Sequence, residues 1–151
     1  MIVLRYIITF RTDFKYQVTI YMSDSPKKIT TEKFEVTLLE EGIVEDHIKP
    51  GAIIEVDDIV AIKKHNYAQA GNKPYVILVT AGELTTFSKE ARELAASKEF
   101  IDAALAKALL INSTAHRIIG NFYLKVNRPY LQTRIFSDRS KALIWLRSFI
   151  K

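Results

Sequence analysis

A run of five apolar residues, Tyr75 to Val79, constrains the fold of this chain more than any other stretch. A strand that is apolar at every position is buried on both faces, which is typical of the middle of a parallel sheet. The run is followed by Ala81-Gly82, a hydroxyl-rich loop at 85–88 and a helical pattern from Lys89 onward. Strand, loop and helix in this order predict the core of a βαβ unit.

The flanking segments extend this unit into an α/β domain. We expect strands at residues 34–38, 43–48, 75–80, 107–112 and 133–136, and helices at 55–70, 89–97, 113–126 and 138–150. Residues 98–106 are less regular, and either extend the second helix or form a separate helical turn. The order ββαβαβαβα predicts a mostly parallel central sheet flanked by helices.

Two of these helices carry apolar stripes at helical spacing, which we expect to face the sheet. The stripe of the first helix comprises Val56, Ile59, Val60, Lys63 by its aliphatic stem, and Tyr67. The stripe of the third helix comprises Ala115, Ile118, Ile119, Phe122 and Val126.

The chain divides by pattern into an N-terminal β-rich extension and linker, residues 1–30, and one α/β domain, residues 31–151. Residues 14–20 alternate as a half-buried strand does, and residues 2–10 form a second β-rich run, which together predict a hairpin. A rival interpretation treats residues 1–21 as an upstream extension that the core does not need, with a start at Met22. Both interpretations stay open.

Composition excludes several classes of site. The 151 residues include no cysteine, so disulfides, thiolate metal sites and a cysteine nucleophile are ruled out. This fits a reducing compartment, and we expect a cytoplasmic protein. No apolar run approaches the roughly 20 residues that cross a bilayer. His47, His65 and His116 lack metal-ligand spacing, and we expect neither a metal nor a cofactor.

The net charge of +5 is unevenly spread. Residues 1–71 carry nine basic and eleven acidic side chains, whereas residues 72–151 carry thirteen and six. A basic half can attract nucleic acid, which also needs aromatic side chains presented to bases. The residues in question lie on different elements, which argues against nucleic acid: Arg117, Lys125, Arg128, Arg134, Arg139 and Lys141, with Tyr123 and Tyr130 among them.

Three loops should meet where the parallel strands end, because the usable crevice of an open sheet lies at the carboxyl ends of its strands. Each loop leads into a helix N-terminus, where free N–H groups and the positive dipole end favour an anion. The candidate binding residues are Glu83, Thr85, Thr86, Ser88, Asn112, Ser113, Ser137 and Asp138. The simpler interpretation is that Ser88, Ser113 and Asp138 are helix N-caps.

An enzyme acting on a small anionic substrate at the same edge is an alternative function. Glu83, the only acid of the central loop, would then serve as the base. No catalytic residue is predicted, because the loop offers neither a nucleophile–base pair nor a phosphate-binding glycine pattern: Phe87 stands at the place of the second glycine of a P-loop.

Three segments carry a resemblance to a known family. They are VTAGELTTFSKEARELAAS at 79–97, LLINSTAHRIIGNFYLKVNRP at 109–129 and RIFSDRSKALIWLRSFI at 134–150. With them the chain, from about residue 33 to residue 151, resembles the STAS-like domains, the SpoIIAA-like fold of anti-sigma-factor antagonists. More narrowly, it is similar to small uncharacterised bacterial proteins described as STAS/SEC14-like.

The resemblance implies a non-enzymatic regulatory domain that binds a protein partner, which the sequence does not identify. In anti-sigma-factor antagonists a serine or threonine after the third core strand is a phosphorylation switch, in an Asp-Ser-Ser/Thr-Gly setting. The matching loop here has hydroxyls at Thr85, Thr86 and Ser88 but lacks that pattern. By position Ser88 is the first candidate and Thr86 the second. The SEC14 label implies a lipid pocket, for which the sequence shows no surplus apolar helix. A homo-oligomer stays open.

Overall fold

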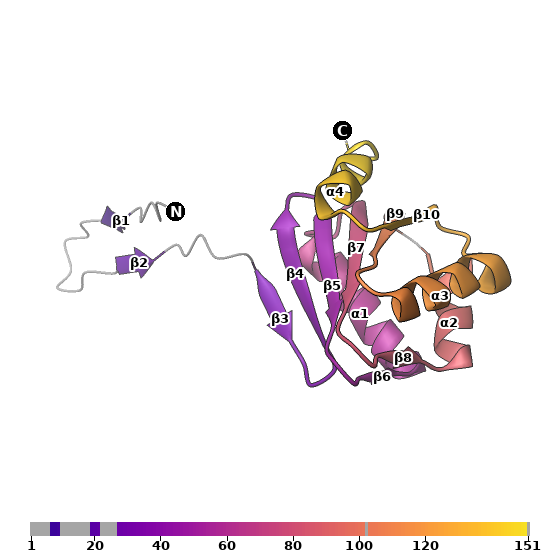
Figure 1. Cartoon of the computed structure of the whole chain (residues 1–151). Coiled ribbons are helices and arrows are strands. Elements are labelled where there is room, and N and C mark those ends of the chain that lie inside the picture. Colours follow the sequence, from indigo (N-terminus) through magenta and orange to yellow (C-terminus); the bar gives the residue numbers. More distant parts are fainter. Residues whose placement is uncertain (1–6, 10–18, 22–26, 102, 151) are drawn as a thin grey trace.

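A six-stranded mixed sheet forms the centre of the molecule (Figure 1). The computed structural model describes residues 7–9, 19–21, 27–101 and 103–150. The sheet comprises, in spatial order, β10 (Thr133–Phe136), β9 (Ala104–Leu110), β7 (Tyr75–Ala81), β5 (Ile43–Ile48), β4 (Phe34–Glu40) and β3 (Lys28–Thr30). The four strands from β10 to β5 pair in parallel, and β4 and β3 add to the edge antiparallel.

The apolar run identified in the sequence is the central strand β7, as predicted. Val76 and Leu78 are completely buried against one face of the sheet, and Tyr75 and Ile77 are buried on the other. β7 has parallel partners on both sides, with Ile77 opposite Val44 of β5 and Lys107 of β9. A strand covered on both faces needs apolar residues at successive positions, which explains the unbroken pattern.

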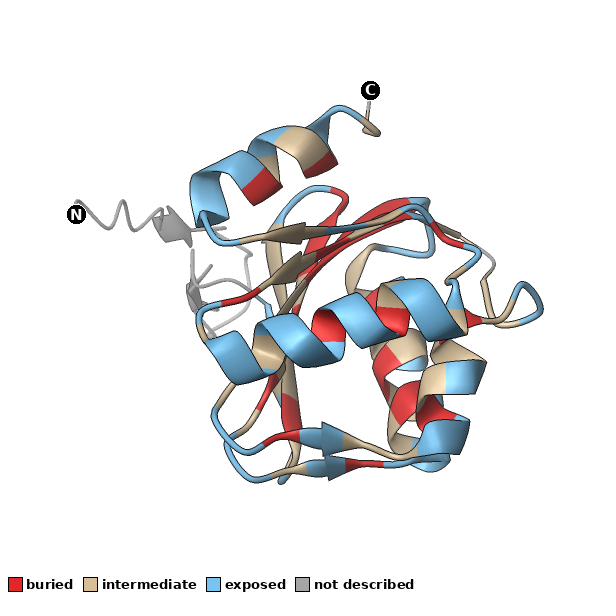
Figure 2. Ribbon diagram, turned by 45° about the vertical axis from the view of Figure 1, so that its right-hand side comes forward, coloured by how far each residue is buried: buried red, intermediate tan, exposed pale blue. Residues whose placement is uncertain are grey.

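In the described part of the chain, four helices cover the two faces of the sheet (Figure 2). The helices are α1 (Val56–Gln69), α2 (Lys89–Ala96), α3 (Thr114–Phe122), which continues into a π-helical turn, η1 (Tyr123–Asn127), and α4 (Arg139–Arg147). Helix α4 packs on one face through Ala142 and Leu146. Helices α1, α2 and α3 lie on the opposite face (Figure 2). The predicted order of core elements is confirmed.

Two short strand pairs stand outside the central sheet. β1 (Ile7–Thr9) pairs antiparallel with β2 (Thr19–Tyr21), in the region where a hairpin was predicted. Most of residues 14–20 lies outside the described residues. β3 is an edge strand inside the segment expected to be a linker. The second pair, β6 (Ile53–Ile54) with β8 (Thr86–Phe87), joins the loops before α1 and α2 in parallel.

Strand β9 begins earlier than its sequence suggests. Residues 104–106 were expected to be helical or irregular, but they pair with β7 in parallel register. Ala106 and Ala108 are fully buried beneath α4. Alanine is the best helix former, so an alanine-rich segment looks helical, yet here its small side chain is what lets a helix approach the sheet.

The apolar stripes of α1 and α3 were largely misassigned. In α1 the buried face comprises Ile59, Ile62 and Asn66, and the predicted Val56 and Val60 are exposed. In α3 and η1 the buried residues are Gly120 and Tyr123, whereas Ile118, Phe122 and Val126 are exposed. A stripe defined by apolar residues alone omits Asn66 and Gly120. Both nevertheless lie on the buried faces of their helices.

Gly82 is held against the loop that follows β5. A Cβ atom at Gly82 would lie 2.6 Å from the backbone nitrogen of Pro50. The Gly82 N–H also donates to the carbonyl of Ile48 at 2.8 Å, so the backbone cannot move away freely.

We expect Gly82→Ala to lower the free energy of unfolding by about 1–3 kcal/mol through overpacking. Urea unfolding measures this, and Glu83→Ala at the exposed neighbour should stay within about 0.5 kcal/mol of wild type. Equal stability of both variants would contradict the close contact.

Candidate functional site

The three predicted loops follow strands that end at one edge of the sheet. β7, β9 and β10 are parallel neighbours, so the segments beginning at Gly82, Asn112 and Ser137 leave from the same edge. The predicted caps are present at all three helices. Ser88 Oγ accepts from Ala91 N at 3.1 Å, Ser113 Oγ from His116 N at 3.1 Å, and Asp138 Oδ1 from Lys141 N at 3.0 Å.

The loop residues do not assemble around one point. Helices α2 and α3 start on one face of the sheet and α4 starts on the other, so their N-termini diverge. Glu83, Thr86, Ser137 and Asp138 are exposed, and Asn112 contacts the ring of His116 at 3.2 Å. Thr85 differs from the others, because it is buried and faces a cavity.

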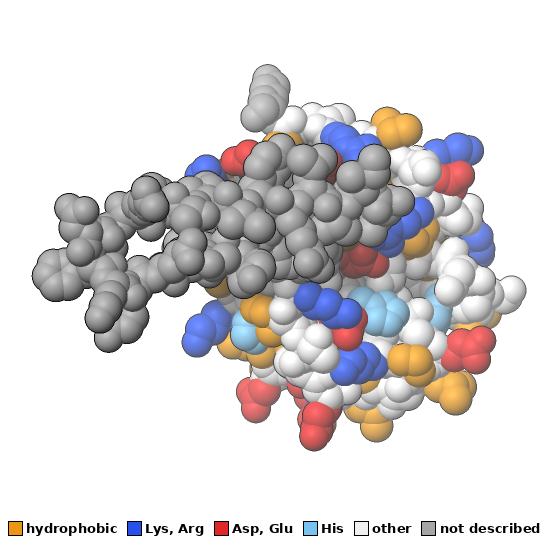
Figure 3. Space-filling view, turned by 90° about the vertical axis from the view of Figure 1, so that its left-hand side faces the viewer, with side chains coloured by type: hydrophobic (Ala, Val, Ile, Leu, Met, Phe, Trp, Pro, Cys, Tyr) orange, Lys and Arg blue, Asp and Glu red, His pale blue; other side chains and the backbone are white. Residues whose placement is uncertain are grey.

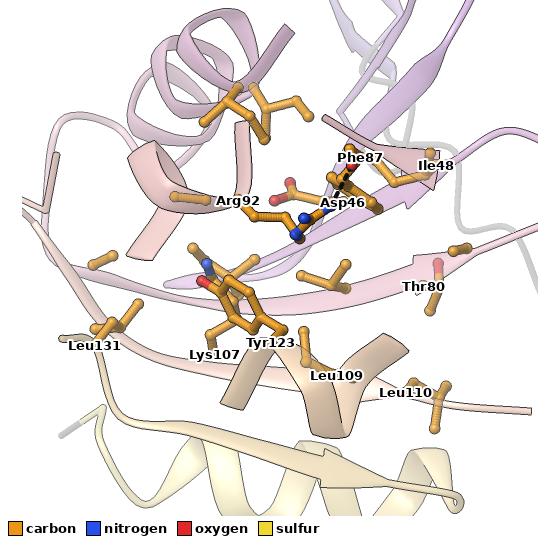
Figure 4. Close-up of a pocket in the computed structure, with 18 of the residues that line it drawn as sticks. Asp46, Ile48, Thr80, Phe87, Arg92, Lys107, Leu109, Leu110, Tyr123 and Leu131 are labelled. Carbon is orange, nitrogen blue, oxygen red and sulfur yellow. Dashed lines mark hydrogen bonds between the residues drawn. The ribbon is translucent and has the colours of Figure 1, made fainter. Parts of the chain in front are cut away.

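That cavity lies between the sheet and the three helices α1, α2 and α3, and has a volume of about 190 Å³ (Figure 4). Its floor is the face of β5, β7 and β9 that points away from α4. Most of the lining is apolar: Ile48, Ile59, Ile62, Tyr75, Ile77, Val79, Phe87, Ala95, Leu109, Ile119 and Leu131. The sequence analysis found no apolar helix to form such a pocket. The cavity is instead lined by residues of β5, α1, β7, α2, β9, α3 and η1 together with the loops that join them.

A buried acid and a buried amide project into this apolar space. Asp46 on β5 is 5% exposed, and its Oδ2 accepts a hydrogen bond from Asn66 Nδ2 on α1 at 3.0 Å. Asp46 Oδ1 and Asn66 Oδ1 are buried without a hydrogen-bond partner. Burial raises the pKa of Asp46 to about 7, although the hydrogen bond from Asn66 and the charge of Lys107 both act to lower it.

Two basic side chains and a tyrosine also line the cavity. Arg92 on α2, Lys107 on β9 and Tyr123 on η1 point toward the same interior space as Asp46 (Figure 4). Arg92 Nη1 donates to the carbonyl of Phe87 at 2.5 Å, while Arg92 Nε and the hydroxyl of Tyr123 are buried without a partner. The Lys107 ammonium lies 5.8 Å from the centre of the Tyr123 ring.

The basic groups of the cavity are not paired with its acid. In the described part of the chain, neither Lys107 nor Arg92 makes an ion pair with a carboxylate. An unpaired buried donor or acceptor destabilises a protein by about 1–3 kcal/mol, and more where the group is charged. A natural core rarely retains several such atoms around one cavity, so each calls for a structural or functional explanation.

Sequence reasoning missed these five residues, although part of the signal was present. Asp46 alternates with Val44 and Ile48 in a predicted strand, which places a carboxylate on the core-facing side. Lys107 shares its face of β9 with Leu109, which also lines the cavity, whereas Ala106 and Ala108 point to the opposite face beneath α4. A charged residue at an inward strand position is informative, because such residues are almost never buried without a partner.

On the opposite face of the sheet, the polar side chains of His47, Thr80, Glu45 and Arg139 are hydrogen-bonded to one another. His47 Nδ1 lies 2.8 Å from Thr80 Oγ1, which donates to Glu45 Oε1 at 3.1 Å. Arg139 of α4 donates to both carboxylate oxygens of Glu45. Burial alone would raise the pKa of Glu45, but the bonds from Arg139 and Thr80 outweigh it and lower that pKa. Thr80 is thus engaged on both sides and is not an activated nucleophile.

The described residues also give observations on nucleic-acid binding, metal binding and membrane spanning. Tyr123, one of two aromatic residues considered for stacking on bases, is buried. Basic and acidic side chains are interspersed over the visible part of the face in Figure 3. Within residues 27–101 and 103–150, no three histidine, aspartate or glutamate side chains gather as metal ligands would. In the same described segments, no helix has the length and apolar content to span a membrane.

Comparison with known proteins identifies relatives by fold and family rather than by activity. Residues 37–150 match the model of a family described as a domain of unknown function, DUF7793. No curated protein matches the chain. The chain is similar to a solved structure from Shewanella loihica PV-4, described as an uncharacterised protein of the DUF3478 family with a SpoIIAA-like fold. That match has 11% identity and a TM-score of 0.48, and covers 81% of this chain and 92% of the other.

Proposed function

Because the chain belongs to the DUF7793 family, whose description assigns no activity, we propose its function from the cavity: it is a non-enzymatic binding domain for a small, mainly apolar molecule. The ligand lies between the sheet and helices α1, α2 and α3. The proposal keeps the regulatory role and the cytoplasmic location expected from the sequence.

The observation that carries this proposal is the combination of size and lining. An apolar cavity of about 150 Å³ is large enough to hold benzene. The cavity here measures about 190 Å³ and is lined mainly by aliphatic and aromatic side chains. Its few polar groups have free hydrogen-bonding capacity, which is the usual composition of a small-molecule site.

We propose binding rather than catalysis because the polar groups of the cavity do not form a nucleophile–base pair. A hydrolytic or transfer site needs a nucleophile within hydrogen-bond reach of a base. Thr85 is the nearest hydroxyl of the predicted loop, and none of the hydrogen bonds found for the described residues joins it to a histidine or carboxylate. Glu83, the acid considered as a base, is exposed.

A regulatory role follows if the ligand changes the loop that a partner would contact. Thr85 lines the cavity, while its neighbour Leu84 is 85% exposed and has a positive φ of 60°. Leucine rarely adopts this backbone conformation, and such strain is concentrated at functional sites. The loop around Leu84 therefore connects the cavity to the predicted partner surface. Ser88, the first candidate for a phosphorylation switch, is engaged in capping α2.

The proposal is tested with a neutral probe. We expect 2-phenylethanol to bind the full chain with a Kd of about 1 mM, corresponding to about −4 kcal/mol. Ala95→Phe, which places a ring inside the cavity, should weaken binding at least about tenfold. The control Ile144→Ala alters an exposed residue of α4 and should bind as wild type does. Isothermal titration calorimetry measures all three proteins. Absence of binding, or equal binding to Ala95→Phe, would contradict the proposed site.

A further inference from the structure

We propose that the ligand of this cavity carries one carboxylate, which is held by Lys107, Arg92 and Tyr123 while the apolar body packs against the sheet. This inference rests on the proposed function and names the chemical class of its ligand. It would make the domain a binder of small apolar monocarboxylic acids.

The first support is the set of unused donors. Arg92 Nε and the Tyr123 hydroxyl are buried without hydrogen-bond partners. Within the described residues the Lys107 ammonium makes no hydrogen bond or ion pair; it lies 5.8 Å from the centre of the Tyr123 ring, and its charge acts to lower the pKa of Asp46. Three donors that face one interior space (Figure 4) match the two oxygens of a carboxylate, which accepts several hydrogen bonds at once.

The second support is the balance of charge. Lys107 and Arg92 bring two cations into the lining. Among the described residues that line the cavity, Asp46 is the one with an acidic side chain. The lining therefore holds an excess of positive charge, which a ligand with a negative group compensates and a ligand with an ammonium group increases.

The third support is the fixed position of the guanidinium. Arg92 Nη1 donates to the Phe87 carbonyl, and the guanidinium carbon lies 5.5 Å from the centre of the Phe122 ring. These contacts hold the side chain, so little conformational entropy is lost when a ligand arrives. Arginine held in this way presents its remaining N–H groups in a geometry suited to carboxylate.

The apolar wall restricts the rest of the ligand. Ile62, Ile77 and Leu109 line the space around the donors, from α1, β7 and β9. A volume of about 190 Å³ accommodates one ring or a short chain, and excludes a long acyl chain that is fully enclosed. A compact aromatic acid is therefore a suitable probe.

The test compares three probes of one shape: phenylacetate, 2-phenylethanol and 2-phenylethylammonium. With the wild-type chain at pH 7 we expect phenylacetate to bind about tenfold more tightly than the alcohol, and the ammonium more weakly than either, because charge-assisted hydrogen bonds form only with the carboxylate. Lys107→Met should remove the preference for phenylacetate and leave the affinity for the alcohol within about twofold. Lys107→Arg should retain the preference.

Two further variants separate charge at this site from charge in general. Arg92→Met should also reduce the preference for phenylacetate. If the loss of its bond to Phe87 prevents folding, the comparison of Lys107→Met with Lys107→Arg still tests the carboxylate inference. Lys64→Met removes the same charge from an exposed position of α1 and should keep the wild-type preference. Equal binding of acid and alcohol, or tighter binding of the ammonium, would overturn the carboxylate inference while leaving the cavity proposal standing. Failure of all three probes to bind would overturn both.

Discussion

The wild-type protein is expected to lose about 4 kcal/mol of stability as the pH rises from about 4 to about 7, and Asp46→Asn should abolish this loss. Burial raises the pKa of Asp46 to about 7 from its ordinary value of 3.8. Between these two values the folded state retains a proton that the unfolded state has released. The folded state then binds more protons, so its stability falls as the pH rises.

The groups that face Asp46 determine how far this effect develops. Asn66 on α1 donates to its carboxylate, Lys107 on β9 favours the ionised form, and the neighbouring Glu45 disfavours it. The other charged or titratable side chains among the described cavity-lining residues are Lys63 on α1, Tyr75 on β7, Arg92 on α2, His116 on α3 and Tyr123 on η1. Asparagine preserves the volume and can accept the bond from Asn66, so the variant removes chiefly the titration.

Urea unfolding at pH 5 and at pH 7.5 measures the part of the effect that falls between these two values, about 2.5 kcal/mol. Glu45 acts in the opposite direction, because its lowered pKa supplies stability that is lost only as the pH falls below about 4.5. The window between pH 5 and pH 7.5 therefore reports mainly on Asp46. The control Glu83→Gln removes an exposed carboxylate and should keep the wild-type dependence. Parallel curves for wild type and Asp46→Asn would show that Asp46 does not titrate in this range.

Leu78→Ala is expected to lower the free energy of unfolding by about 3–5 kcal/mol. Leu78 is completely buried at the middle of β7 and packs in the cluster that joins the sheet to α4 through Ala108 and Leu146. The alanines around it cannot expand to fill the space, so the cavity persists and adds to the loss of apolar burial.

Chemical denaturation followed by circular dichroism measures this change. Ile144→Ala on α4 removes a side chain that is 66% exposed, and should change stability by less than about 0.5 kcal/mol. A loss below about 1 kcal/mol for Leu78→Ala would be incompatible with a central, doubly covered β7.

The elements that could be predicted from the sequence are those whose signal is local. The run at 75–79 specifies a doubly buried strand, and the alternation in 34–38 followed by Glu41-Gly42 specifies the β4–β5 hairpin. Ser88, Ser113 and Asp138 are caps because a short oxygen-bearing side chain satisfies the free N–H groups of the helix that follows.

The parts that could not be predicted depend on pairing across crossover connections. Residues 104–106 look helical or irregular by local pattern, and only their parallel pairing with β7 makes them part of strand β9. Tyr123, considered with Tyr130 as an aromatic residue among the basic side chains, is buried where α3 passes into a π-helical turn. The cavity combines Asp46, Arg92 and Lys107 from distant segments, and no spacing in the chain records that meeting.

The exposed face of α3 illustrates the same limit. Ile118 and Phe122 form an apolar pair one turn apart, which favours a buried face by periodicity alone. In the structure Ile118 is 66% exposed and Gly120 is buried instead, with a Cβ at that position lying 2.7 Å from Ile111. The close approach of α3 to Ile111 and Ile135, which favours a glycine at this position, accompanies the orientation that the periodicity did not predict.

The most direct test of the cavity is a titration of phenylacetate into methyl-labelled protein, followed by nuclear magnetic resonance. The two faces of the sheet provide an internal comparison, because Ile62 and Ile77 line the cavity whereas Ile43 and Leu146 pack beneath α4. We predict that the methyl signals of Ile62 and Ile77 shift in a saturable way and those of Ile43 and Leu146 do not. Shifts confined to the α4 face, or no saturable shift at either face, would contradict a ligand site between the sheet and helices α1, α2 and α3.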